Sequence, residues 1–232
     1  MAQVVIRSLN KKFDEVHAVK DVNLDIRDKE FMVFVGPSGC GKTTILRIAA
    51  GLDRDFQGAR RISPSTRVAM VFQEPHLLPW RTVEDNIRIA MDAASATGAI
   101  GEWLERFDLV EQRRQYAGEL SLGQARRVAI ARAISVGPDL LLLDEPLVSL
   151  DETVAARLRG ELRAIAESRK LGILLVTHDL AEAIELSDRL LFLGGKPACV
   201  VLERELSMPR NRRDRRTVAA LVDEIAGQMN GH

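Results

Sequence analysis

A strand, a glycine-rich loop and the start of a helix follow one another without a break between Phe31 and Thr44. The apolar run Phe31–Val35 leads into Gly36-Pro37-Ser38-Gly39-Cys40-Gly41-Lys42-Thr43-Thr44. Glycines let the backbone curl so that successive N–H groups point inward, and the new helix adds the positive end of its dipole. This G-x-x-x-x-G-K-[ST] pattern, set between a strand and a helix, predicts a loop that cradles the phosphates of a nucleoside triphosphate.

Two side chains complete the expected phosphate site. The Lys42 ammonium supplies a point charge for the β and γ phosphates, and the Thr43 hydroxyl lies where a shared Mg²⁺ would sit. We therefore expect nucleotide contacts from the whole loop, which comprises Gly36, Pro37, Ser38, Gly39, Cys40, Gly41, Lys42, Thr43 and Thr44.

A second buried-type strand ends in two adjacent carboxylates. The run Asp139–Leu143 leads to Asp144 and Glu145, at the carboxyl edge where open α/β sheets bind ligands. We expect Asp144 to hold Mg²⁺ through water and Glu145 to polarise the water that attacks the γ phosphate. The alternative is that this Asp-Glu pair only forms a turn.

A family resemblance enters with the segment between these motifs. Leu120-Ser121-Leu122-Gly123-Gln124 resembles the Leu-Ser-Gly-Gly-Gln signature of ATP-binding cassette (ABC) ATPases, and the motifs follow that family's order over nearly the whole chain. The resemblance implies that Ser121, Leu122, Gly123 and Gln124 contact ATP held by another subunit, in a head-to-tail dimer. Leu122 departs from the usual glycine, which puts the rate of hydrolysis in question.

Four more positions resemble functional residues of the family. Gln73 matches a glutamine that contacts Mg²⁺ and senses the transport partner, although a Gln after a strand is commonly a loop residue. His178 matches a switch histidine that orients the attacking water, against a structural role at a strand end. Asp151 matches the loop that crosses the dimer interface, where Val148 replaces a serine. Phe13 matches the aromatic residue that stacks on adenine, with a core phenylalanine as the alternative.

The segment Gln73–Trp80 points to a membrane partner. Leu77, Leu78 and Trp80 are expected to form a groove, which in the family receives a short helix of a membrane permease. The Leu-Leu-Pro-Trp sequence resembles that of the ATPases of importers for nitrate, sulfonates, taurine and related small anions. The alternative is that this turn caps the chain's own core.

Composition sets limits on partners and location. The 33 basic and 33 acidic residues cancel, so the chain offers no general basic surface and we expect no nucleic acid partner. The two cysteines, Cys40 and Cys199, are expected to be reduced. We found no signal peptide and no apolar stretch of about eighteen residues, which predicts a peripheral protein on the cytoplasmic side of the cell membrane.

The order of the elements predicts an α/β fold. Apolar strands around Val33, Val71, Leu142 and Leu175 alternate with helices, which favours a mostly parallel sheet. The resemblance implies a P-loop NTPase (RecA-like) fold with an antiparallel N-terminal β part and an inserted helical subdomain. We expect one domain over 1–232, with a RecA-like lobe at 1–78 and 136–232 and a helical subdomain at 79–135.

Two helical segments carry patterns that predict their packing. Trp103, Leu104 and Phe107 share one face of a helix, which is typical of core packing. Near the end of the chain, Arg210, Arg212, Arg213, Arg215 and Arg216 precede an amphipathic helix. They are expected either to touch anionic headgroups or to form a solvated face, with the helix packed on the sheet lobe.

Together these features predict the ATP- and Mg²⁺-dependent ATPase subunit of an ABC importer for a small organic or inorganic anion. Its expected partners are a second ATPase subunit, an integral-membrane permease and an extracytoplasmic solute-binding protein. The first alternative is a soluble ABC ATPase acting on nucleic acid or a protein assembly. The second is a cassette that binds ATP without hydrolysis, which Leu122 favours and Glu145 and His178 oppose.

Overall fold

The computed structural model describes residues 2–91, 96–169 and 171–230. Its contacts divide the chain into two compact units, the first comprising Met1–Pro64 and Gly172–His232 and the second Ser65–Leu171. The expected division into lobes at 1–78 with 136–232 and at 79–135 stays a prediction.

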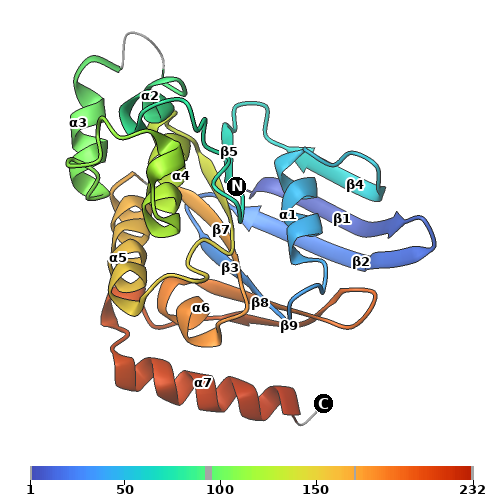
Figure 1. The fold of residues 1–232 in the computed structure, drawn as a ribbon. Coiled ribbons are helices and arrows are strands. Elements are labelled where there is room, and N and C mark those ends of the chain that lie inside the picture. Colours follow the sequence, from blue (N-terminus) through green and yellow to red (C-terminus); the bar gives the residue numbers. More distant parts are fainter. Residues whose placement is uncertain (1, 92–95, 170, 231–232) are drawn as a thin grey trace. The chain divides into compact units, whose positions relative to one another are not determined.

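The first unit begins with an antiparallel sheet. Strands β1 (Ala2–Phe13), β2 (Val16–Arg27) and β4 (Gln57–Ile62) pair in the order β2-β1-β4 (Figure 1). Val22, Leu24 and Ile26 are buried and alternate with more exposed residues, so the strand with one buried face is confirmed. The antiparallel N-terminal β part is confirmed as well.

The second sheet of this unit is mainly parallel. Strands β3 (Phe31–Val35), β7 (Gly172–Thr177), β8 (Arg189–Gly194) and β9 (Cys199–Glu205) lie in the order β7-β3-β8-β9. β3 runs parallel to β7 and β8, and only β9 is antiparallel to its neighbour. Every residue of β3 is buried, which explains a continuous apolar run rather than an alternating one.

Four helical segments follow these strands. Helix α1 (Lys42–Ala50) starts after the glycine loop and α6 (Leu180–Leu186) starts after β7. The short 3-10 helix η2 (Arg210–Arg212) precedes the last helix, α7 (Arg215–Asn230). α7 packs beside α6 (Figure 1) and buries Ile225 completely.

The second unit combines two parallel strands with several helices. β5 (Val68–Val71) pairs in parallel with β6 (Leu140–Asp144). Between them in the chain lie α2 (Val83–Arg88), α3 (Ala96–Arg106), the 3-10 helix η1 (Ala117–Glu119) and α4 (Leu122–Ser135), and α5 (Glu152–Arg169) follows β6. Trp103, Leu104 and Phe107 are all buried, so their expected core role is confirmed.

The C-terminal arginines divide between exposed and buried positions. Arg213 is buried, and its guanidinium donates to the carbonyl oxygens of Ile184, Ser187 and Met208 at 2.5, 2.6 and 2.9 Å. It therefore satisfies carbonyls at and after the end of α6, which have no partners within the helix. Arg210 lies 5.5 Å from the centre of the Phe31 ring. The interpretation of the whole run as a solvated face is wrong for Arg213, while Arg212, Arg215 and Arg216 are exposed.

A buried ion network holds the two sheets of the first unit together. Arg189 donates to Glu30 through Nε and Nη2 at 2.7 and 2.8 Å, to Glu203 through Nη1 at 2.6 Å, and to the carbonyl oxygen of Asp25. Burial lowers the pKa of Arg189, but the two carboxylates outweigh this effect and raise it. Arg189 thus stays charged and links β2, β3, β8 and β9.

We expect Arg189→Met to lower the free energy of unfolding by about 3–5 kcal/mol, because it leaves the buried Glu30 carboxylate without its partner. Chemical denaturation measures the change. The control is Arg7→Met, which removes the exposed partner of Asp25 and should have little effect. Equal losses in the two variants would contradict the importance of this network.

Candidate functional site

The predicted phosphate loop forms between β3 and α1 in the first unit. Gly39 and Gly41 have φ values of 74° and 96°, a region that strongly favours glycine. Gly41 occupies the N-cap position of α1 and provides no side-chain cap, and the N-terminus of a helix is where backbone amides bind an anion. Pro37, Ser38, Gly39 and Thr43 are exposed, which leaves the loop open to solvent.

Close contacts crowd two of the loop's glycines. A Cβ atom on Gly36 would lie 2.4 Å from the carbonyl oxygen of Leu193. One on Gly41 would lie 3.2 Å from both the carbonyl oxygen of Ala18 and the Cβ of Ala198. Strand β2 and the turn between β8 and β9 therefore support the loop from behind.

Lys42 is almost fully buried, and its ammonium donates to the carbonyl oxygens of Gly36 and Pro37 at 2.7 and 2.8 Å. A buried ammonium needs polar partners, and phosphate oxygens would be stronger ones than neutral carbonyls. Cys40, within the loop, is buried, and both Cys40 and Cys199 are free, as expected.

The first unit also brings His178 to the same sheet edge as the loop. Strands β3 and β7 are parallel, with Val35 opposite Thr177. Gly36 and His178 each follow by one residue, so the phosphate loop and the histidine leave adjacent strands side by side. His178 is exposed there.

The histidine lies in a braced turn. Thr177 Oγ1 accepts from the Asp179 amide at 3.0 Å and donates to Glu182 at 3.2 Å, while Asp179 accepts from the Glu182 amide at 3.0 Å. Sequence reasoning missed this network. The Asp-x-x-Glu spacing after His178 is typical of a helix N-cap followed by an acidic residue, and this pattern indicates the network from sequence alone.

Phe13 lies at the tip of the β1–β2 hairpin and is 49% exposed, so the alternative of a core phenylalanine is wrong. The Lys11 ammonium lies 4.7 Å from the centre of its ring and pairs with Asp53 and Asp55. Phe13 is opposite Val16, two residues before the Ala18 that supports Gly41. The exposed Phe13 ring therefore lies on the same hairpin that supports the phosphate loop.

The second unit gathers the predicted acidic residues and Gln73. Val71 of β5 is opposite Leu143 of β6, and Gln73 and Glu145 each follow by two residues. Both therefore lie beyond the carboxyl ends of neighbouring parallel strands. Asp144 is buried, whereas Glu145 is partly exposed and has φ of 47°. A left-handed glutamate is uncommon, and such conformations concentrate at functional sites.

The predicted signature segment starts α4. Ser121 is its N-cap: the Gln124 amide donates to Ser121 Oγ at 3.3 Å, and the Ser121 amide donates to Gln124 Oε1 at 2.9 Å. Leu122 is 47% exposed, so its side chain does not fill the core. A Cβ on Gly123 would lie 3.3 Å from Leu150, which places the signature beside the segment that contains Asp151.

Asp151 is exposed and caps α5, accepting from the Val154 amide at 3.0 Å.

The expected partner segment is held in an exposed position. Asn86, which is fully buried, bonds both the amide and the carbonyl of Leu78, at 2.8 and 3.1 Å. Arg132 donates to the carbonyls of Pro75 and His76 at 3.2 and 3.0 Å. Trp80 is 68% exposed, so for this residue the alternative of a core cap is wrong.

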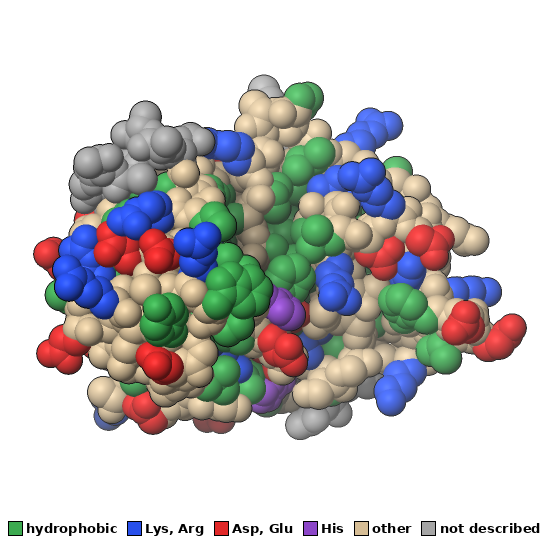
Figure 2. All heavy atoms as spheres, turned by 45° about the horizontal axis from the view of Figure 1, so that its top comes forward, with side chains coloured by type: hydrophobic (Ala, Val, Ile, Leu, Met, Phe, Trp, Pro, Cys, Tyr) green, Lys and Arg blue, Asp and Glu red, His purple; other side chains and the backbone are tan. Residues whose placement is uncertain are grey.

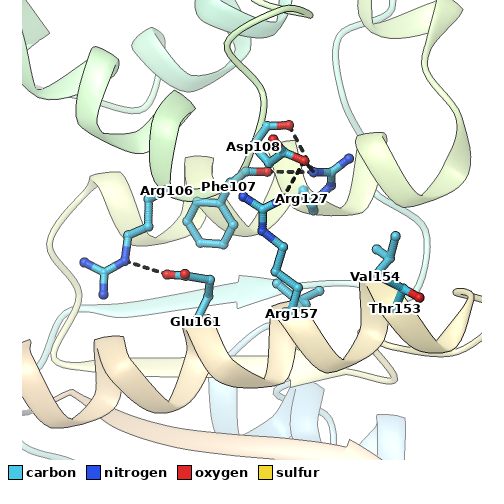
Figure 3. Close-up of a pocket in the computed structure, with 9 residues that line it drawn as sticks. Arg106, Phe107, Asp108, Arg127, Thr153, Val154, Arg157 and Glu161 are labelled. Atoms are coloured by element: carbon cyan, nitrogen blue, oxygen red, sulfur yellow. Dashed lines mark hydrogen bonds and ion pairs between the residues drawn. The ribbon is translucent and has the colours of Figure 1, made fainter.

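A cavity of about 190 Å³ also lies in the second unit, at the junction of the turn after α3 with α4 and α5 (Figure 3). Arg127 donates to Asp108 at 3.1 Å and to the Phe107 carbonyl at 2.9 Å, Arg157 pairs with Asp108 at 2.8 Å, and Arg106 donates to Glu161 at 2.9 Å. These contacts tie the three elements together. The cavity is lined by none of the residues predicted for the site.

Oxygen ligands suit Mg²⁺, and the residues predicted for it supply them. Thr43 is exposed at the start of α1, Asp144 ends β6, and Gln73 follows β5. Each of these side chains, in its own unit, carries an oxygen donor of the kind that the ion prefers. Among the described residues, no helix has the length and apolar character needed to cross a bilayer.

Comparisons with known proteins agree with the predicted motifs. The family model described as "ABC transporter" matches residues 19–148. The aliphatic sulfonates import ATP-binding protein SsuB of Bacillus thuringiensis subsp. konkukian (strain 97-27) is 38% identical, covering 90% of this chain and 87% of the relative. SsuB 1 of Pseudomonas savastanoi pv. phaseolicola (strain 1448A / Race 6) is 42% identical, covering 90% and 89%.

Solved structures give the same result for the fold. An ATP-binding cassette solved as a dimer in a post-hydrolysis state, bound to ADP and Pi, matches with a TM-score of 0.79 and 29% identity, covering 89% of this chain and all of that chain. The resemblance and the α/β P-loop NTPase fold are thus confirmed, together with the ATPase activity and the ATP and Mg²⁺ on which it depends. The chain belongs to the ABC transporter family.

Proposed function

We propose that this chain is the ATP-hydrolysing subunit of an importer for small anions, with aliphatic sulfonates as the solute class. The observation that carries the proposal is the phosphate loop, with left-handed Gly39 and Gly41, an uncapped helix start and the buried Lys42. The solute class rests on the relatives named above, which are aliphatic sulfonate import proteins.

Each predicted residue then has a distinct part in hydrolysis. Amides of the loop and the Lys42 ammonium bind the phosphates, and Phe13 supplies a flat face for adenine. Thr43, Gln73 and Asp144 would hold Mg²⁺, which when bound neutralises charge on the phosphates. Glu145 accepts the proton of the attacking water, and His178 orients that water.

Hydrolysis is proposed to take place in a head-to-tail dimer. Ser121, Leu122, Gly123 and Gln124 of one copy contact the ATP held by the other, and Asp151 lies at the interface. Ser121 Oγ and Gln124 Oε1 accept bonds from each other's amides in the chain described here, and the Ser121 hydroxyl can donate to a phosphate while it accepts such a bond. The structural relative bound to ADP and Pi is itself a dimer.

The proposed location is peripheral, on the cytoplasmic side of the cell membrane beneath an integral-membrane permease. The Ala117 amide donates to the Arg81 carbonyl at 2.9 Å. This hydrogen bond joins the residue after the exposed Trp80 to the residue after Tyr116. Trp80 and Tyr116, both more than half exposed, offer an apolar surface for the permease. An extracytoplasmic solute-binding protein completes the proposed system.

Nucleic acid is not a favoured partner. Basic and acidic side chains are interspersed on the face drawn in Figure 2, and the whole chain has a formal net charge of zero. A nucleic acid backbone is bound mainly by clustered basic charge. The relatives named above are import proteins, which also gives the soluble alternative no support.

We expect Gly41→Ala to weaken ATP binding, because φ of 96° costs a residue with a Cβ about 1–2 kcal/mol and the new atom would press on Ala18 and Ala198. Titration with a fluorescent ATP analogue measures the affinity. Gly39→Ala adds backbone strain without a close contact, so its loss should be smaller. Gly160→Ala, in the open on α5, should leave affinity unchanged. Wild-type affinity in Gly41→Ala would argue against this loop as the phosphate site.

We expect Glu145→Gln to keep ATP binding and to slow hydrolysis by about 10²–10⁴-fold, because the amide cannot accept the proton of the attacking water. Phosphate release measures the rate, and light scattering should find a dimer that persists in ATP and Mg²⁺. Glu167→Gln, an exposed change on α5, is the control. Full turnover in Glu145→Gln would remove Glu145 as the catalytic residue.

We expect a stoichiometric multi-span protein to co-purify with the tagged chain from gently solubilised membranes of its source cell. Mass spectrometry identifies what is bound. Trp80→Ala should reduce the recovery of that protein, whereas Val110→Ala, another exposed apolar change, should not. Uptake of a radiolabelled alkanesulfonate, lost when the chain is deleted, tests the solute class. Recovery of soluble partners alone would contradict the importer proposal.

A further inference from the structure

Strand β1 carries a buried lysine to which the proposed hydrolysis gives no role. Lys11 is 4% exposed, and a buried ammonium needs polar partners. Its Nζ donates to a carboxylate oxygen of Asp53 at 3.1 Å, to a carboxylate oxygen of Asp55 at 3.3 Å, and to the carbonyl oxygen of Asp55. Three acceptors therefore hold the ammonium in one place, beside the segment that follows α1.

The acidic segment that holds Lys11 is itself fixed to the C-terminal end of α1. The amides of Leu52 and Asp53 both donate to the carbonyl oxygen of Arg47, at 3.0 and 3.3 Å, which satisfies a carbonyl in the last turn of the helix. The Asp55 amide donates to Asp53 Oδ1 at 3.0 Å. Because α1 begins at the phosphate loop, Lys11 connects β1 to the helix whose other end bears the phosphate site.

The same ammonium lies over the ring of Phe13. Residues two apart in a strand point to the same face, and Lys11 Nζ is 4.7 Å from the centre of the Phe13 ring. A cation at this distance is attracted by the negative face of an aromatic ring. The ring is 49% exposed whereas the lysine is buried, so Lys11 holds the ring from the protein side.

A bulge in the hairpin relates this ring to the phosphate loop. The pairing register of β1 with β2 shifts directly after Lys11, because β2 has one extra residue there, Ala18. The carbonyl oxygen of Ala18 would lie 3.2 Å from a Cβ on Gly41. The strand pair that carries Lys11 and Phe13 is thus in direct contact with the loop that receives the phosphates.

We propose that Lys11 is a positioning residue for Phe13 in recognition of the base: its fixed ammonium covers one face of the ring and holds the ring so that the opposite face stacks on adenine. This inference rests on the proposed function, in which Phe13 contacts the base and the loop binds the phosphates. A ring that is already held in place loses less entropy when the base binds. Lys11 therefore contributes to affinity for the base, and the chemical step does not depend on it.

The first test is the split between KM and kcat for ATP in the full chain. Lys11→Met keeps most of the side-chain length without the charge, and should raise the KM about threefold or more while kcat changes little. Lys11→Arg returns a cation to the ring and should recover most of the loss. Lys11→Gln replaces the Met variant if that one does not fold.

The matched control for this split is Lys12→Met. It removes an exposed charge from the next position of the same strand, so it reports any general effect of charge on ATP affinity, and it should leave the KM unchanged. A wild-type KM in the charge-removing variant of Lys11, or an equal rise in Lys12→Met, would overturn the inference.

The second test separates the base from the phosphates. Inorganic tripolyphosphate carries phosphates without a base, and its affinity is measured by displacement of a fluorescent ATP analogue. Lys11→Met should weaken the binding of ATP and leave that of tripolyphosphate unchanged, because only ATP reaches the Phe13 ring. Equal losses for the two ligands would show that Lys11 supports the phosphate loop or the fold in general, and would overturn the inference.

The third test is a double-mutant cycle with Phe13→Ala, measured as affinity for ATP. Phe13→Ala alone should weaken binding about fivefold or more, as the loss of a stacked base does. If Lys11 acts through the ring, Lys11→Met should cause almost no further loss in the Phe13→Ala background. The same loss in both backgrounds would show that Lys11 acts elsewhere.

The two levels of proposal fail in different ways. If Phe13→Ala alone keeps wild-type affinity, the adenine contact assigned to Phe13 fails and Lys11 has no ring to position. If Phe13→Ala weakens ATP binding as expected but Lys11→Met is additive with it, only the positioning role is overturned. Thermal unfolding of each variant separates loss of fold from loss of affinity.

Discussion

The parallel register of buried strands decides where the functional side chains of each unit lie. In the first unit, the pairing of Val35 with Thr177 brings the phosphate loop and His178 to one edge. In the second, the pairing of Val71 with Leu143 does the same for Gln73 and Glu145. Parallel strands have their carboxyl ends on the same side, so motifs that lie far apart in the chain become neighbours.

The phosphate loop depends on close packing as much as on the flexibility of glycine. Gly36 is crowded by the Leu193 carbonyl, and Gly41 by Ala18 and Ala198. The loop is therefore held from behind by strands that have no catalytic residue of their own. This support keeps the amides of the loop in place before any phosphate arrives, which reduces the entropy lost on binding.

Buried arginines connect separate elements of each unit. Arg189 joins strands through Glu30 and Glu203, Arg213 caps α6, and Arg132 fixes the segment before Trp80. Each is satisfied by carboxylates or by backbone carbonyls, as a buried cation must be. Arg126 departs from this rule because two of its nitrogens have no partner within residues 2–91, 96–169 and 171–230, and the departure occurs on the helix that starts with the signature.

The sequence by itself determined the local features: the strand-loop-helix around Lys42, the apolar strands, the core face of α3 and the family to which these motifs belong. These features depend on neighbouring residues and on the short periods of helices and strands. Only the tertiary structure decided which charges are buried and what they contact, as for Arg126, Arg189 and Arg213. It also decided that Phe13 and Trp80 are exposed. The physical reason is that burial depends on elements that lie far apart in the chain, such as Glu30 and Arg189, and no local pattern records their approach.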